Sequence, residues 1–338
     1  MNETKVRAPK PEELARRAER AVAARGSERS VRDVEPLLGG TSSLTYSAWL
    51  DGATPAHVVL KVAPPGLEPV RNRDVLRQAR VLEVLANSPG VAVPSVLGTD
   101  VGDPPDVPPL FVMSFIPGES YEPVHNGANS AVSDEEVEAR ALAAARMLAA
   151  LHAANPSSLT GEKETDLARE VGRWTKAFAT VDDDLRGGFR ADRVHEALVK
   201  ALPPSLPPVI LHGDYRLGNM QCEGREIGGL IDWEIWSLGD PRLDLAWFLL
   251  NSDPAHPSFK AGGDRMPAAE RLVAAYEEAA GVSIEGLDWF GALVRYKQAA
   301  ASALIAKNSR RMAKEGVDTG SIEINIPKLL DWAASLLG

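Results

Sequence analysis

The sequence predicts an α+β protein of two lobes, a small N-terminal lobe built on strands and a larger, mainly helical C-terminal lobe. Strand-like apolar segments concentrate in the first 116 residues, whereas helical periodicity dominates the remainder. At 338 residues the chain is also long enough for two lobes or domains.

Local patterns predict the N-terminal elements in chain order. Residues 11–25 are rich in Ala, Glu, Leu and Arg, and residues 70–86 have apolar side chains at helical spacing, so both predict helices. Strand-like segments occupy residues 45–50, 57–63, 95–99 and 110–115, and the proline-rich residues 102–109 predict a loop.

The helical part begins with a capping box. Ser133 stands at the N-cap and Glu136 three residues later, before an apolar stripe that runs to His152. We interpret His152 as a hydrogen-bonded residue near the helix end and not as a ligand. Further helices are predicted at residues 166–180, 191–202, 267–280, 287–307 and 326–337.

Residues 209–244, VILHGDYRLGNMQCEGREIGGLIDWEIWSLGDPRLD, carry the chemistry. Short strands are predicted at residues 209–211, 220–222 and 227–231, the last two joined by a turn. Asp214 precedes this hairpin, Asn219 follows five positions later, and Asp232 stands at its far end, so their side chains can meet. Phosphoryl transfer needs an orienting carboxylate, oxygen ligands for Mg²⁺ and a cation on the phosphates. Protein kinases space an Asp and an Asn in the same way.

Three motifs carry a resemblance to a known family: LHGDYRLGN at residues 211–219, IDWE at 231–234 and GDPRLDLAW at 239–247. They resemble the aminoglycoside phosphotransferase family of the protein-kinase-like superfamily. The resemblance implies a bilobal protein-kinase-like fold whose small lobe is an antiparallel sheet with a helix. Residues 110–118 resemble the hinge between the lobes, so we place the boundary at Pro117 and Gly118, with residues 1–116 in one lobe and residues 117–338 in the other. It also implies an ATP- and Mg²⁺-dependent phosphotransferase that acts on a hydroxyl of a small molecule.

The site residues follow from the motifs and the resemblance. Asp214 is the expected catalytic carboxylate, which accepts or orients the acceptor proton, and Arg216 can steady the transferring phosphoryl group. Asn219 and Asp232 are the expected Mg²⁺ ligands. The residues expected to bind the nucleotide, ATP or alternatively GTP, are Gly40, Ser42, Ser43, Lys61, the Ser114 carbonyl and the Ile116 N–H. An ordinary Gly-Gly hairpin turn is the alternative for the small-residue segment around Gly40.

Other residues of the motifs are assigned supporting roles. His212 is expected to brace the catalytic loop by hydrogen bonding. Asp244 is expected to cap a helix, and the resemblance implies that it braces the same loop.

One position departs from the family pattern. The helix at residues 70–86 has Gln78 where the family has a Glu that pairs with the lysine, here Lys61. Glutamine can exchange hydrogen bonds with an ammonium group but cannot neutralise it. Glu83 or Asp74 could pair with Lys61 instead if the helix register were shifted.

Composition limits the partners. A net charge of −10 argues against nucleic acid and against an anionic membrane surface as partners. The N-terminus lacks the apolar segment of a signal peptide, and no apolar run approaches the roughly 18 residues of a spanning helix. The single cysteine, Cys222, is interpreted as a small core residue. We therefore expect a cytoplasmic protein, and no pattern specifies its oligomeric state.

The sequence does not specify the acceptor, and it allows two alternatives to phosphoryl transfer. No motif identifies the hydroxyl-bearing acceptor, and four tryptophans that could line a pocket are better interpreted as core: Trp174, Trp236, Trp289 and Trp332. Gln78 favours an alternative function, a nucleotide-binding protein without significant catalysis. A metal-dependent hydrolase using His212, Asp214 and Asp232 is a third and weaker hypothesis, because a second histidine at suitable spacing is missing.

Overall fold

Five strands near the N-terminus form one antiparallel sheet in the order β1-β2-β3-β5-β4. The computed structural model describes residues 8–37, 43–54, 56–123, 131–258, 265–312 and 319–338. The strands are β1 (Val31–Pro36), β2 (Leu44–Leu50), β3 (Ala56–Val62), β4 (Val96–Asp100) and β5 (Leu110–Ser114). The four predicted strands are thus confirmed, and β1 is an addition. A register shift between Arg32 and Glu35 breaks the alternation in β1 that would have predicted it.

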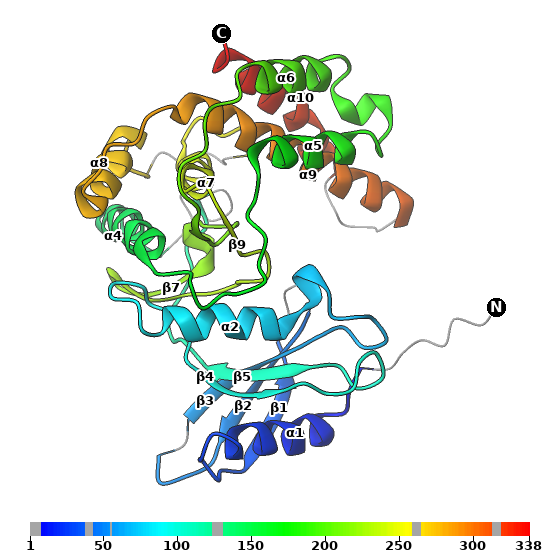
Figure 1. Ribbon diagram of the computed structural model, residues 1–338, viewed down its shortest axis with the longest axis vertical. Coiled ribbons are helices and arrows are strands. Elements are labelled where there is room, and N and C mark those ends of the chain that lie inside the picture. The colour runs from blue at the N-terminus through cyan, green and yellow to red at the C-terminus, as the bar shows by residue number, and fades with distance from the viewer. Residues whose placement is uncertain (1–7, 38–42, 55, 124–130, 259–264, 313–318) are drawn as a thin grey trace, which may run out of the picture.

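The sheet has a helix on each face (Figure 1). The predicted first helix, α1 (Pro11–Ala23), packs its apolar side against Leu60, Val62 and their neighbours. Val59 belongs instead to the hydrophobic core that includes α2 (Val75–Leu85). Because successive side chains of a strand point to opposite faces, Lys61 lies on the same face as Val59, toward α2. This alternation turns the lysine away from α1 and toward the helical part of the chain.

The second predicted helix begins five residues later than expected. A short 3₁₀ helix at Arg71–Arg73 precedes α2, and the carboxylate of Asp74 accepts a hydrogen bond from the N–H of Arg77 at 3.0 Å. An Asp in this position satisfies an N–H group that the first helical turn leaves without a partner. The cap therefore fixes where α2 starts.

The rest of the chain is mainly helical, as predicted. Its helices are α4 (Asp134–Ala153), α5 (Leu167–Phe178), α6 (Arg190–Lys200), α7 (Arg242–Ser252), α8 (Ala269–Ala280), α9 (Leu287–Met312) and α10 (Thr319–Ser335). The capping box at Ser133 and Glu136 is present. The helix expected at 326–337 begins earlier, at Thr319, and continues through Pro327.

Two strand pairs carry the polar loops of the helical part. β6 (Val209–Leu211) pairs with β9 (Ser237–Gly239), and β7 (Met220–Glu223) pairs with β8 (Glu226–Leu230). The sequence predicted the first strand and the hairpin but not the short β9. Both pairs lie between α7 and the sheet in Figure 1.

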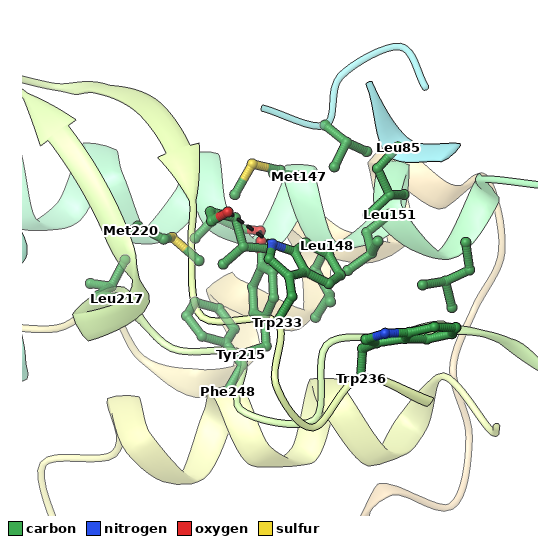
Figure 2. Packing of buried hydrophobic residues seen from close by; sticks show 14 of the residues in the cluster. Leu85, Met147, Leu148, Leu151, Tyr215, Leu217, Met220, Trp233, Trp236 and Phe248 are labelled. Carbon is green, nitrogen blue, oxygen red and sulfur yellow. Dashed lines mark hydrogen bonds between the residues drawn. The ribbon is translucent and has the colours of Figure 1, made fainter. Parts of the chain in front are cut away.

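Residues of these loops are anchored in a large hydrophobic core. Figure 2 shows the rings of Tyr215 and Phe248 beside each other and Trp233 close to them. The indole N–H of Trp233 donates to the carbonyl of Leu230 at 2.9 Å, and the hydroxyl of Tyr215 donates to the carbonyl of Ala144 at 2.6 Å. These buried polar groups have partners, so the core holds the loops in one arrangement.

The chain passes from the sheet to the helical part after Ser114. Glu119 then forms an isolated antiparallel bridge with Cys222, which is buried as predicted. Ile116 packs on β8, where a Cβ atom at Gly229 would lie 3.0 Å from the Ile116 side chain, so glycine permits the close approach. A lobe boundary at Pro117 and Gly118 stays a prediction. Of the described helices, none is long and apolar enough to cross a membrane.

Candidate active site

The β7–β8 hairpin brings the predicted site residues together. Met220 pairs with Leu230 at the open end of the hairpin, and the N–H of Ile231 donates to the carbonyl of Asn219 at 2.9 Å. Asn219 and Asp232 therefore lie on neighbouring chain segments. Asn219 also reaches back to Asp214, since its Nδ2 donates to the Asp214 Oδ2 at 2.9 Å.

Asp214 is held by side chains on both of its oxygens. Its Oδ2 accepts hydrogen bonds from Asn219 and from the Nε of Arg216, the latter at 3.0 Å. Its Oδ1 accepts a hydrogen bond from the indole Nε1 of Trp247 at 2.8 Å. The carboxylate is thus fixed in orientation and partly buried.

These contacts decide the protonation state of Asp214. Burial opposes its ionisation, but the charge of Arg216 and the hydrogen bonds from Trp247 and Asn219 outweigh burial, so the pKa of Asp214 lies below its usual value. For Arg216, burial favours the neutral form, but Asp214 and Glu122 outweigh it and raise the pKa. Asp214 is therefore an ionised carboxylate that can accept a hydrogen bond from a hydroxyl.

His212 braces the loop as predicted. Its Nε2 donates to the carbonyl of Ile231 at 2.9 Å, and its Nδ1 accepts from the N–H of Asp214 at 3.2 Å, which assigns the neutral tautomer. The side chain is fully buried. Because both ring nitrogens are engaged within the loop, His212 is not placed to bind a metal, and the hydrolase hypothesis loses its only histidine.

Asp244 braces the same loop from α7. Its carboxylate accepts from the N–H of His212 at 2.6 Å and from the N–H of Gly213 at 2.9 Å. Burial opposes its ionisation, but His152 and the backbone hydrogen bonds outweigh burial and lower its pKa. The N-cap of α7 is Pro241, so the expectation that Asp244 caps the helix is wrong, whereas the bracing role is confirmed. Its neighbour His152 bonds to the hydroxyl of Tyr276 at 2.7 Å.

The donor set of Asn219 and Asp232 fits a magnesium ion. With its amide nitrogen on Asp214, Asn219 has its Oδ1 as the ligating atom, and Asp232 supplies a half-exposed carboxylate. Asp232 has a φ of 67°, a conformation that a non-glycine residue adopts at a cost in free energy and that is frequent at functional sites. Magnesium is typically held by one or two such side chains together with phosphates and water.

Lys61 points into the same region from the sheet. Its Nζ lies 4.0 Å from the Oδ1 of Asp232. Gln78 is 2 % exposed, and together with Lys61 and Asp232 it lines a void of about 10 Å³. The register that places Gln78 beside the lysine is therefore confirmed.

The two alternative partners of Lys61 are engaged elsewhere. Asp74 caps α2, and Glu83 forms an ion pair with Arg25 in which both side chains are exposed. A shifted helix register is therefore wrong. The acidic neighbour of the lysine is Asp232, which the hairpin supplies.

The structure describes only some of the other residues that are expected to bind the nucleotide. Gly40 and Ser42 lie outside the described residues. Ser43 is buried, and its hydroxyl has no hydrogen-bond partner among the residues that the structure describes. At the end of β5, the N–H of Phe115 donates to the carbonyl of His57, and that of Ser114 donates to the carbonyl of Ser95. Neither bond uses the Ser114 carbonyl or the Ile116 N–H.

Three side chains at the site were missed in the sequence. Glu122 forms an ion pair with Arg216, the indole of Trp247 bonds to Asp214, and the Nζ of Lys297 donates to the carbonyl of Gly213 at 3.0 Å. Only Trp247 left a signal, because it follows Asp244 by three residues and so lies on the same side of α7. Glu122 and Lys297 are remote in sequence from the motifs.

Comparison with known sequences identifies relatives of this arrangement. A family model described as the phosphotransferase enzyme family matches residues 33–289. Among curated proteins, acyl-CoA dehydrogenase family member 10 from Mus musculus is 27 % identical over 65 % of this chain. The aligned part is 21 % of that relative, so the chain spans about a fifth of the length of the protein that it matches.

Solved structures share the fold at low sequence identity. A putative aminoglycoside phosphotransferase from Ralstonia eutropha has a TM-score of 0.72 and 20 % identity, over 90 % of this chain and 92 % of that one. A mutant of aminoglycoside phosphotransferase APH(4)-Ia, in ternary complex with ADP and hygromycin B, has a TM-score of 0.59 and 16 % identity, with 90 % and 95 % covered. The bilobal kinase-like fold expected from the motifs is thereby confirmed.

Proposed function

Because the chain belongs to the phosphotransferase enzyme family, we propose that it transfers the γ-phosphoryl group of ATP to a hydroxyl of a small molecule. The observation that carries this proposal is the convergence of four side chains from separate elements. Asn219 donates to Asp214, the chain segments of Asn219 and Asp232 lie side by side at the β7–β8 hairpin, and the Nζ of Lys61 on β3 lies 4.0 Å from Asp232. This set supplies the carboxylate, the oxygen ligands and the cation that phosphoryl transfer requires.

Each residue has one task in the proposed reaction. Lys61 binds the nucleotide phosphates, and Asn219 with Asp232 would hold Mg²⁺, which neutralises phosphate charge when bound. Asp214 orients the acceptor hydroxyl so that its oxygen faces the γ-phosphorus. As the new P–O bond forms, the bond to the β–γ bridging oxygen breaks, ADP leaves, and the acceptor proton passes to Asp214 or to solvent.

Arg216 has a more restricted task. It donates to Asp214 and pairs with Glu122, so two carboxylates hold its guanidinium beside the catalytic carboxylate. In that position the cation lies near the negative charge that develops on the transferring group. We therefore propose that Arg216 stabilises this charge while Glu122 limits its movement.

The nucleotide is bound by the residues expected from the motifs, including Ser43, the Ser114 carbonyl and the Ile116 N–H. A relative of the same fold binds ADP and hygromycin B together, which supports a nucleotide beside a hydroxyl-bearing acceptor. The acceptor class itself is left open, because function resides in the site and not in the fold. A cytoplasmic location, where ATP is available, is part of the proposal.

A screen with labelled ATP tests the proposal. The purified protein is incubated with Mg²⁺, γ-labelled ATP and, in turn, sugars, amino alcohols, aminoglycosides and macrolides, and transfer of label to the acceptor is measured. Asp214→Ala should lower kcat by roughly 10²- to 10⁴-fold and leave ATP affinity nearly unchanged. Asp106→Ala, an exposed carboxylate in a loop, is the matched control and should retain full activity.

Two results would contradict the proposal in different ways. Near wild-type transfer by Asp214→Ala would show that the carboxylate is not in the reaction. Tight binding of ATP with no transfer and no hydrolysis would favour the alternative, a nucleotide-binding protein without significant catalysis.

A further inference from the structure

Two side chains from the helical part converge on the catalytic loop. Trp247 is on α7 and Lys297 is on α9, and both are half-buried. The indole of Trp247 donates to the Oδ1 of Asp214 at 2.8 Å. The ammonium of Lys297 donates to the carbonyl of Gly213 at 3.0 Å, on the residue before Asp214.

The two side chains also contact each other. The Nζ of Lys297 lies 4.1 Å from the centroid of the Trp247 indole ring. A cation over an indole face at this distance is attracted by the negative charge of the ring, and the attraction grows when the pair is partly desolvated. The nearest ring on another helix, that of Trp174, has its centroid 5.9 Å from the same nitrogen. Lys297 thus holds the loop backbone and the indole at the same time.

The arrangement limits the freedom of the carboxylate. Asn219 and Arg216 both donate to the Oδ2 of Asp214. Because both contacts are on one oxygen, the carboxylate could still rotate about the Cβ–Cγ bond. The Trp247 indole holds the other oxygen and removes this rotation. Catalytic groups that are displaced by about 1 Å can lose as much as 10²-fold in rate, so a fixed carboxylate matters for the reaction.

We infer that Trp247 and Lys297 are positioning residues that act as a pair: Trp247 fixes the orientation of the Asp214 carboxylate, and Lys297 fixes Trp247 and the loop. The inference rests on the proposed role of Asp214 in phosphoryl transfer. Neither residue needs to touch the nucleotide or the acceptor for this effect.

The indole N–H resonances test the geometry without any turnover. In protein with ¹⁵N-labelled tryptophan, Trp247→Phe identifies the Trp247 signal by its loss. Asp214→Asn and Lys297→Met should each shift that signal. The Trp289 signal is the internal control and should stay in place, because the indole N–H of Trp289 donates to the carbonyl of Leu198 at 3.0 Å. An unmoved Trp247 signal in Asp214→Asn and Lys297→Met would overturn the inference.

Kinetics then test the consequence, with water as the acceptor in Mg²⁺-dependent ATP hydrolysis. Trp247→Phe and Lys297→Met should lower kcat by about 10- to 100-fold and change KM for Mg–ATP by less than about twofold. Lys297→Arg keeps a cation and donors, so it should recover most of the loss. Trp174→Phe should behave as wild type.

Failure of the positioning inference and failure of the proposed function give different results. Unchanged kcat in both variants would overturn the inference. A fall in kcat accompanied by a fall in both ATP affinity and Tm would overturn it as well, because that pattern indicates a general loosening of the fold. If the wild-type protein turns over no ATP with any acceptor, the proposed function fails, while the indole shifts still decide whether the pair positions Asp214.

Discussion

Replacement of Gln78 tests how Lys61 is held in the active site. Gln78 is 2 % exposed, and its Nε2 has no hydrogen-bond partner among the described residues. The Nζ of Lys61 lies 4.0 Å from the Oδ1 of its acidic neighbour, Asp232. We therefore expect Lys61 to bind the nucleotide without a hydrogen bond from Gln78 of α2.

The contacts give the size of the expected effects. A buried donor without a partner costs about 1–3 kcal/mol, so Gln78→Met, which keeps the length but not the amide, should raise the free energy of unfolding by about 1 kcal/mol. Gln78→Glu adds a carboxylate beside Lys61. Attraction at about 4 Å is worth roughly 4 kcal/mol at an effective dielectric constant near 20, but burial of the charge costs several kcal/mol. The two terms nearly cancel, so we expect Gln78→Glu to be tolerated.

Urea titration and calorimetry with Mg–ATP measure the two effects. Both Gln78 variants should bind ATP within about threefold of wild type, whereas Lys61→Ala should lose at least about tenfold, which is roughly 1.4 kcal/mol. Asp74→Asn and Glu83→Gln are the controls and should bind ATP normally. A loss in Gln78→Met as large as that in Lys61→Ala would refute the reasoning, because it would show that the amide holds the lysine.

Three further predictions concern the metal ligand, the brace of the catalytic loop, and His256, a buried residue outside the site that bonds to Gln298. Asp232→Ala should abolish the enhancement of ATP binding by Mg²⁺, because the anionic ligand is gone; equal enhancement in calorimetry with variant and wild type would contradict the metal assignment. Asp244→Asn should lower the free energy of unfolding by about 2–4 kcal/mol, since an amide can keep only one of the two N–H bonds; an unchanged urea midpoint would argue against the brace. Burial lowers the pKa of His256 from 6.5, and its Nδ1 accepts the N–H of Ser258, so stability should fall as pH drops below about 6.5. His256→Gln should weaken this dependence of stability on pH. If the variant and the wild type lose stability in parallel as the pH falls, His256 is not the group responsible.

Local patterns predicted most of the elements because their signals are contained in a few neighbouring residues. Short strand-like apolar segments located β2, β3 and β5, and the capping box located α4. The errors fall where a local signal is weak or is overridden. The irregular register hid β1, the Asp74 cap moved the start of α2, and α10 begins before Pro327 and continues past it.

The sequence by itself determined which groups can do the chemistry. The spacing of Asp214, Asn219 and Asp232 about a hairpin is a property of the chain, because a short turn brings the two ends of a hairpin together whatever else surrounds it. The three motifs at residues 211–219, 231–234 and 239–247 also carried the resemblance to the family and, through it, the expected fold.

Only the tertiary structure decided how those groups are held. Lys297 and Gly213 are 84 positions apart in sequence, and Arg216 and Glu122 are 94 apart, so no local pattern connects them. The contact of Lys61 with Asp232 likewise depends on how the sheet meets the hairpin. These pairings form because helices and strands pack in one arrangement, and the packing of distant elements leaves no trace in residue spacing.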